Sequence, residues 1–136
     1  MQIVTMNYST EESTTLLTMQ DTSLTAAITP ASSSNIIIVV CCTYMRVHEA
    51  SSNDVGIRYQ LYNSTDSELV IYNMEKHNGA SANYDVGTGA TIIGYDTGRS
   101  VATTYLLQFR AGYSGNTAYV CTNNDKGTFM LIEVEP

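Results

Sequence analysis

Two histidines in this sequence have a carboxylate nearby, which is the smallest arrangement that acid–base catalysis needs. His48 is followed by Glu49, and His77 comes two residues after Glu75. A histidine held by a carboxylate can take up and return a proton near neutral pH. Neither pair is accompanied by a G-x-S-x-G nucleophile motif or an H-E-x-x-H zinc motif. Both histidines fall near the ends of expected strands, where solvated loops are the rule, so we predict that the protein is not an enzyme.

Other polar motifs resemble ligand sites only in part. Gly87-Thr88-Gly89 has the glycines of a phosphate loop but lacks the Lys and Ser/Thr that should follow, and a strand rather than a helix comes next. We interpret it as a flexible turn between strands. Asp85, Asp96 and Asp125 lie in or near expected loops without the spacing of a calcium loop. We expect solvated surface acids there, and no metal or cofactor.

The three cysteines do not have the spacing of a metal site. Cys41 and Cys42 are adjacent in an apolar run, so in a strand their side chains point to opposite faces. We expect two small buried hydrophobic side chains, because a disulfide between neighbours would be strained. Cys121 stands alone and does not complete a tetrahedral zinc site with them.

Tyrosine dominates the aromatic residues, with ten Tyr against two Phe and no Trp. Tyrosine stacks well on sugar rings, and it also suits interfaces in which the hydroxyl stays wet. We favour core and subunit-interface roles and keep binding of a cell-surface glycan as the alternative. Six tyrosines fall in expected strands: Tyr59, Tyr62, Tyr95, Tyr105, Tyr113 and Tyr119.

Charge and length limit the partners. A net charge of −7 without any run of Lys or Arg disfavours nucleic acid and anionic membranes. The N-terminus lacks the basic and apolar regions of a signal peptide, and the longest apolar run, Ile36–Cys42, is too short to span a bilayer. We therefore expect synthesis in the cytoplasm of the cell. The 136 residues fit one domain, residues 1–136, with a hydrophobic core.

The recurring pattern along the chain is a short run rich in Val, Ile, Thr and Tyr that ends in turn residues. Turn signals include Asn63–Asp66, Asn78-Gly79, Ser114–Asn116 and Asp125–Gly127. This spacing predicts an all-β fold, a two-sheet antiparallel jelly-roll sandwich of about ten strands. The expected strands are Gln2–Tyr8, Thr14–Met19, Leu24–Thr29, Asn35–Val47, Val55–Tyr62, Glu68–Met74, Ala90–Asp96, Val101–Tyr113, Thr117–Cys121 and Thr128–Glu135.

Two expected strands are apolar on both faces, Ile36–Val40 and Phe129–Ile132. The second sheet of a sandwich covers one face of such a strand. No helix is expected that covers the other face, so we predict that a neighbouring subunit does. By contrast, Val55–Tyr62 alternates apolar and polar side chains, as a strand with one solvated face does.

Two segments resemble phage fibre and decoration domains. Ala27–Val40 is similar to their "ITP-x-S-x-S-x-I" entry into a central strand, and Thr103–Ala111 is similar to their "T-x-Y-x-x-Q" strand. A Gly/Asn turn, the strand Thr117–Val120 and a closing strand that ends at Leu131–Val134 follow in the same order. The resemblance covers the chain from about Thr14 to Glu135.

This resemblance implies a jelly roll similar to the tumour-necrosis-factor and complement-like trimers, which associate through their inner sheets. It also implies a virion structural protein of a tailed phage, located on the capsid surface. Fibre proteins carry a long shaft before this domain, whereas the domain here begins almost at Met1. We therefore expect a homotrimeric decoration (cement) protein that binds the major capsid protein. The alternative is a receptor-binding tip of a tail fibre or spike. Family members often carry Lys where Asn35 stands, at the entry to a strand.

Five large side chains are the candidates for the subunit interface or the core. The sequence does not decide between these two places, because both faces of their strands carry apolar residues. A host cytokine-like ligand would share the fold but requires a signal peptide, and a small hydrolase would require a nucleophile next to a histidine. The five candidate residues are Tyr105, Leu107, Phe109, Phe129 and Leu131.

Overall fold

The chain forms ten β-strands in a computed structural model that describes residues 1–49, 54–77, 84–122 and 125–136. Runs rich in Val, Ile, Thr and Tyr form the strands because these side chains pack well on a pleated surface. The described residues contain no helix long and apolar enough to cross a membrane. The strands are β1 (Gln2–Tyr8), β2 (Glu12–Thr14), β3 (Gln20–Ile28), β4 (Ile36–Glu49), β5 (Val55–Asn63), β6 (Glu68–His77), β7 (Tyr84–Thr97), β8 (Thr103–Ala111), β9 (Asn116–Val120) and β10 (Gly127–Val134).

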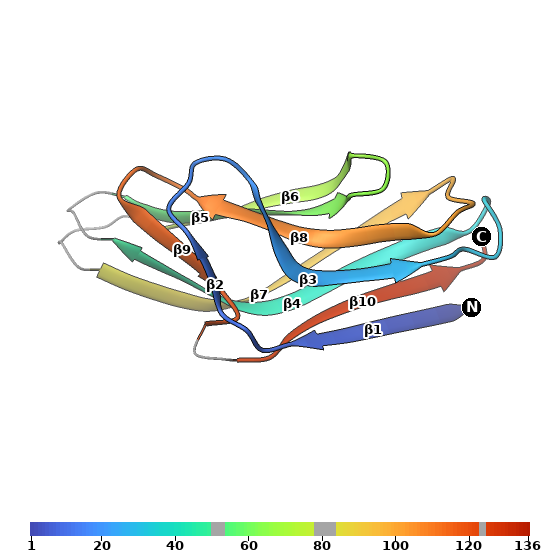
Figure 1. The fold of residues 1–136 in the computed structure, drawn as a ribbon, viewed down its shortest axis with the longest axis horizontal. Helices are drawn as coiled ribbons and strands as arrows, with labels where there is room; N and C mark the ends of the chain where they lie inside the picture. Colours follow the sequence, from blue (N-terminus) through green and yellow to red (C-terminus); the bar gives the residue numbers. More distant parts are fainter. Residues whose placement is uncertain (50–53, 78–83, 123–124) are drawn as a thin grey trace.

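The strands form two antiparallel sheets that face each other (Figure 1). One sheet has β1, β10, β4 and β7 side by side, and β9 with β2 extends it where β10 ends. The other sheet has the order β3-β8-β5-β6. Most sequential strands lie in opposite sheets, although β1 and β2, β5 and β6, and β9 and β10 each share a sheet, and strands distant in sequence pair, as in a jelly roll. The predicted all-β jelly-roll sandwich is confirmed.

The core lies between the two sheets and follows from the alternation of side chains. In β5, Val55, Ile57, Tyr59 and Leu61 are all buried, as their shared face predicts. The polar side chains between them, such as Arg58, are half-buried on the other face. Alternating patterns of this kind fix the register, since a slip of one residue would turn every apolar side chain outward.

The second expected strand is wrong in its position. β2 ends at Thr14 and β3 begins at Gln20, and the residues between them form a connection. β2 belongs to one sheet and β3 to the other, so the chain must cross between the sheets here. The backbone carbonyl of Leu16 accepts a hydrogen bond from the Ala111 amide at 3.0 Å, which attaches the connection to the end of β8.

The turn expected at Gly87–Gly89 is also wrong, because these residues lie inside β7. The strand pairs with β4 over its whole length, with Gly87 opposite Arg46 and Gly89 opposite Tyr44. A Cβ atom at Gly87 would overlap the Tyr44 hydroxyl group. The glycine therefore makes room for a tyrosine ring that lies across the strand.

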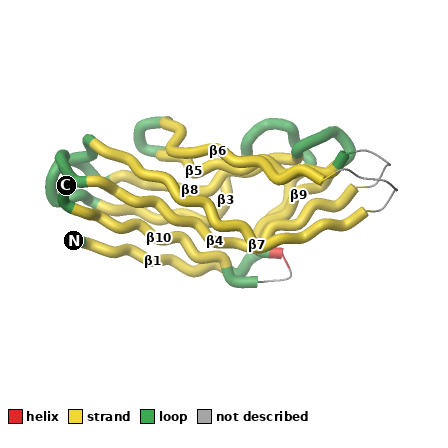
Figure 2. Tube along the Cα trace, turned by 180° about the vertical axis from the view of Figure 1, so that it is seen from behind, coloured by secondary structure: helices red, strands yellow, loops and turns green. Residues whose placement is uncertain are grey.

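Several expected turns are present. The Asn63 side-chain oxygen accepts hydrogen bonds from the amides of Thr65 and Asp66, both at 3.1 Å, and closes the β5–β6 turn. Gly115 has a positive φ of 88° in the β8–β9 turn, where glycine is favoured. The turn predicted at Asn78-Gly79 lies outside the described residues. Both chain ends lie at the same end of the sandwich (Figure 2).

Candidate functional site

The outward face of the four strands β1, β10, β4 and β7 is the candidate functional site. We use the name outward face for their side chains that point away from the core. The strand register aligns these side chains in rows that cross all four strands. One row consists of Ile3, Ile132, Ile38 and Tyr95, and the next consists of Thr5, Met130, Val40 and Ile93.

These two rows are apolar apart from Thr5, and they lie open in the single chain. Ile3, Ile93 and Tyr95 are 54%, 56% and 71% exposed, and the β4 and β10 side chains between them are half-buried. Neither row contains a charged residue. A contiguous apolar surface of this kind is unusual on a soluble monomer and indicates a contact surface.

The outward face becomes polar and then charged further along β4. Arg46 lies over the Tyr119 ring, 4.0 Å from its centroid, and forms an ion pair with Asp85 at 3.3 Å. His48 Nδ1 is 3.8 Å from the same Asp85 carboxylate. The Arg46 Nε atom is buried without a hydrogen-bond acceptor. The apolar rows and this cluster of Arg46, Asp85 and His48 therefore occupy different parts of one sheet face.

The His48–Glu49 pair is not arranged as a catalytic pair. His48 is half-buried on the outward face, whereas Glu49 is fully buried and accepts a hydrogen bond from the Asn116 side chain. Adjacent residues of a strand point to opposite faces, so the two cannot share a proton. The side chain of His77 lies outside the described residues.

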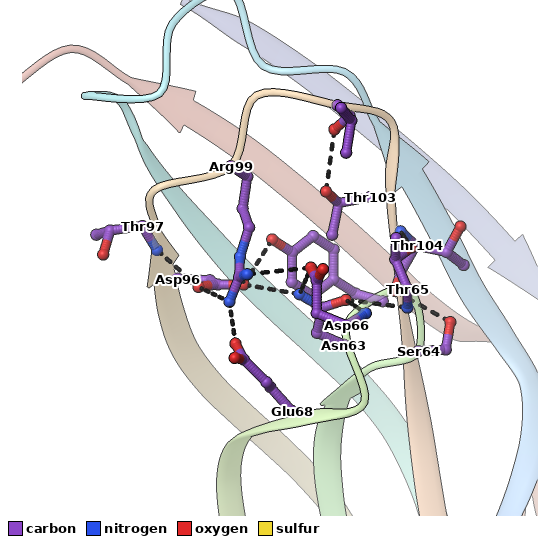
Figure 3. Close-up of polar contacts among 12 residues, drawn as sticks. Asn63, Ser64, Thr65, Asp66, Glu68, Asp96, Thr97, Arg99, Thr103 and Thr104 are labelled. Carbon is purple, nitrogen blue, oxygen red and sulfur yellow. Dashed lines mark hydrogen bonds and ion pairs between the residues drawn. The ribbon is translucent and has the colours of Figure 1, made fainter.

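A polar cluster joins the β5–β6 turn to the β7–β8 loop at one end of the sandwich (Figure 3). Arg99 donates from Nε to Asp96 at 2.8 Å and from Nη1 to Asp66 at 3.0 Å, and a third ion pair joins it to Glu68. The core residue Tyr105 donates its hydroxyl proton to Asp96 at 3.0 Å. The arginine thus lies between three carboxylates that sequence reasoning did not group.

Burial and hydrogen bonding act in opposite directions on the Asp96 carboxyl. Burial raises its pKa, but hydrogen bonds from Arg99, Tyr105 and the Thr97 amide outweigh burial and hold the pKa below its ordinary value. Burial raises the pKa of the Tyr105 hydroxyl, and the neighbouring Asp96 carboxylate raises it further. The cluster is therefore a fixed ionic link between loops. No group of His, Cys, Asp or Glu in the described residues could hold a metal ion.

The cysteines differ from each other in their surroundings. Cys41 points into the core, and burial raises the pKa of its thiol far above the ordinary value. Cys42 is exposed on the outward face, so the prediction that both neighbours are buried is wrong for Cys42. It is solvated because β4 has only one sheet packed on it in the single chain. Cys121 is buried and lies 3.5 Å from the Thr43 hydroxyl.

All five candidate residues lie in the core between the sheets. None is more than 2% exposed, so they join the two sheets and do not form the outward face. Sequence reasoning missed the outward residues Ile3 and Ile93 of the flanking strands, and it named Tyr95 only among six tyrosines with core or interface roles. Their alternation with inward residues such as Val4 and Ile92 was the available signal. The five are Tyr105, Leu107, Phe109, Phe129 and Leu131.

No protein-family model and no curated protein matches this chain. Among solved structures, dimeric latent PorU from Porphyromonas gingivalis is similar over 98% of this chain, with a TM-score of 0.51 and 12% identity. The chain spans 13% of the length of PorU, so this likeness shows the fold alone. The infectious bursal disease virus Gx strain gives a TM-score of 0.38 at 14% identity, over 96% of this chain and 36% of that one. The VP2 subviral particle of infectious bursal disease virus gives 0.38 at 14% identity, over 99% and 38%. At these scores the two viral structures carry no argument about function.

Proposed function

We propose that this chain is a virion structural protein of a tailed phage, a homotrimeric capsid decoration protein that assembles through the outward face. The observation that carries the proposal is the pair of uncharged apolar rows across β1, β10, β4 and β7. The resemblance of Ala27–Val40 and Thr103–Ala111 to phage decoration and fibre domains supplies the biological setting.

A second copy of the same chain is the occupant that suits this face best. The protein carries a net charge of −7, so copies repel each other wherever their charged surfaces approach. The two apolar rows carry no charge, and burying them removes hydrophobic side chains from water. Depletion of charge in the centre of a contact surface, with polar residues around it, is the usual composition of a protein interface.

The proposed action of the trimer is mechanical. A partner that binds the assembled capsid but not its separated subunits stabilises the assembled state by mass action. The trimer would bridge neighbouring copies of the major capsid protein and so resist expansion or loss of the shell. No catalytic step, metal or cofactor is required for this action.

The trimer is tested by light scattering on the purified protein. We expect a mass three times that of the 14.8 kDa chain. Ile93→Asp places a charge at the β7 end of one row on a side chain that is 56% exposed, so it should leave the monomer folded and abolish the trimer. Leu69→Asp is the matched control, because Leu69 is 57% exposed but lies on β6 of the other sheet.

A monomeric wild-type protein, or trimers of both variants, would contradict assembly through the outward face. Sedimentation with shells of the major capsid protein tests the second half of the proposal. A trimer that sediments with the shells supports the decoration role. A trimer that does not sediment with the shells but binds saturably to a glycan array would instead support the receptor-binding tip of a fibre or spike.

A further inference from the structure

Two arginines face each other on the sheet that does not carry the outward face. Arg58 of β5 lies directly opposite Arg110 of β8, and both are half-buried on the surface that points away from the core. Side chains in directly opposed positions of an antiparallel pair are close neighbours, and like charges there destabilise the sheet. The charges of Arg58 and Arg110 therefore do not stabilise the sheet.

The pair lacks the partners that neutralise the other buried charges of the chain. No carboxylate whose side chain the structure describes forms an ion pair with either arginine, whereas Arg46 and Arg99 both have carboxylate partners. Arg58 Nε is buried without an acceptor, and Arg110 Nη1 donates only to the Ala111 carbonyl at 3.3 Å. No side chain that the structure describes accepts a hydrogen bond from either guanidinium group, and each group carries five N–H donors.

The neighbouring row shows why the surrounding side chains do not neutralise the pair. Gln60 donates to Gln108 at 2.6 Å, and Gln108 donates to the Asp21 carboxylate at 2.6 Å. Asp21 is the acidic residue of the adjacent strand β3, and its carboxylate is hydrogen-bonded to Gln108 and not to an arginine. A patch of two positive charges therefore persists in a protein that has six Lys and Arg residues against thirteen Asp and Glu residues.

We propose that Arg58 and Arg110 form a binding site for a carboxylate of an acidic peptide segment on a partner protein. The two arginines occupy directly opposed positions of neighbouring strands, and a guanidinium group matches the planar, bidentate geometry of a carboxylate. An isolated pair within an acidic surface attracts one or two carboxylates, whereas a polyanion such as nucleic acid would be repelled by the rest of the surface. The site lies on the other sheet and does not depend on trimer formation.

Calorimetric titration at low ionic strength tests the site, with a short poly-glutamate peptide as the probe and a poly-glutamine peptide of equal length as its control. We expect the wild-type protein to bind only the poly-glutamate peptide. Arg58→Gln and Arg110→Gln should each weaken binding roughly fivefold, as expected for a partly exposed charge pair. Lys126→Gln removes the same charge from an exposed side chain elsewhere and should leave binding unchanged.

A second variant separates ligand binding from a structural role of the arginines. Arg110→Glu replaces the like-charge pair by an opposite-charge pair, so it should raise the melting temperature and abolish peptide binding. A lower melting temperature would show that the Arg110 side chain supports the sheet itself. Absence of peptide binding, equal loss in Lys126→Gln, or binding of N-acetylneuraminic acid in place of the peptide would overturn the proposal.

Discussion

Replacing Asp96 by asparagine tests whether the polar cluster at the end of the sandwich holds the two loops. The Asp96 carboxylate accepts hydrogen bonds from Arg99, Tyr105 and Asn63, at distances of 2.8–3.1 Å. Asparagine keeps the shape of the side chain but removes its charge and one acceptor oxygen. The new amide also turns an N–H group toward the hydrogen-bond donors, so Arg99 loses one of its three carboxylate partners.

The expected loss follows from the burial of the carboxylate. Its side chain is 12% exposed, so water replaces the lost interactions poorly. A hydrogen bond to a charged group contributes about 1.5–3 kcal/mol, and Asp96→Asn should lower the free energy of unfolding by about that amount. The matched control is Asp85→Asn, because Asp85 also pairs with an arginine but is 48% exposed. An exposed ion pair contributes up to about 1 kcal/mol, so the control should lose less.

The assay is urea unfolding at one fixed protein concentration, because dissociation of an oligomer would otherwise add to the measured stability. The pKa of folded Asp96 lies below its ordinary value of 3.8. The carboxylate therefore contributes its full stabilisation above pH 3.8 and loses it as the pH falls through the folded pKa. Asp96→Asn should lack this acid-range loss. Equal destabilisation by the two variants, or an unchanged acid transition, would refute the reasoning.

Two further predictions concern the core and the outward face. Phe129→Ala empties a fully buried site between the sheets and should lower the free energy of unfolding by about 3–5 kcal/mol in urea titrations; a loss below about 1 kcal/mol would contradict the placement of Phe129 in the core. Cys42 is exposed in the single chain, so one thiol should react rapidly with Ellman's reagent in Ile93→Asp and be shielded in the wild-type trimer. Equal Cys42 reactivity in both proteins would argue against burial of the outward face. Cys41 and Cys121 should react only after unfolding.

The sequence determined the fold class and most of the strands. Clear alternation predicted the start of β5, its end to within one residue and its buried face, because side chains in a strand point alternately to the two sides. The Asn63–Asp66 turn was also readable, since an asparagine side chain closes a turn through local hydrogen bonds. Such signals depend on residues close together in the chain.

Features that depend on packing between distant segments were not readable. Gly87–Gly89 has the glycines of a turn, but Gly87 is needed inside a strand because a side chain there would overlap the Tyr44 ring. Tyr44 belongs to a strand distant in sequence, so this reason could not be read from the local sequence. The cluster around Arg99 depends on two loops that meet only when the sheets face each other.

The division between core and surface was likewise decided by tertiary structure. The sequence gives Phe129 and Met130 the same apolar character, but only the second sheet determines that Phe129 is buried and Met130 faces outward. The local pattern sets the alternation, whereas the partner sheet selects the face, because burial is a property of the assembled layers.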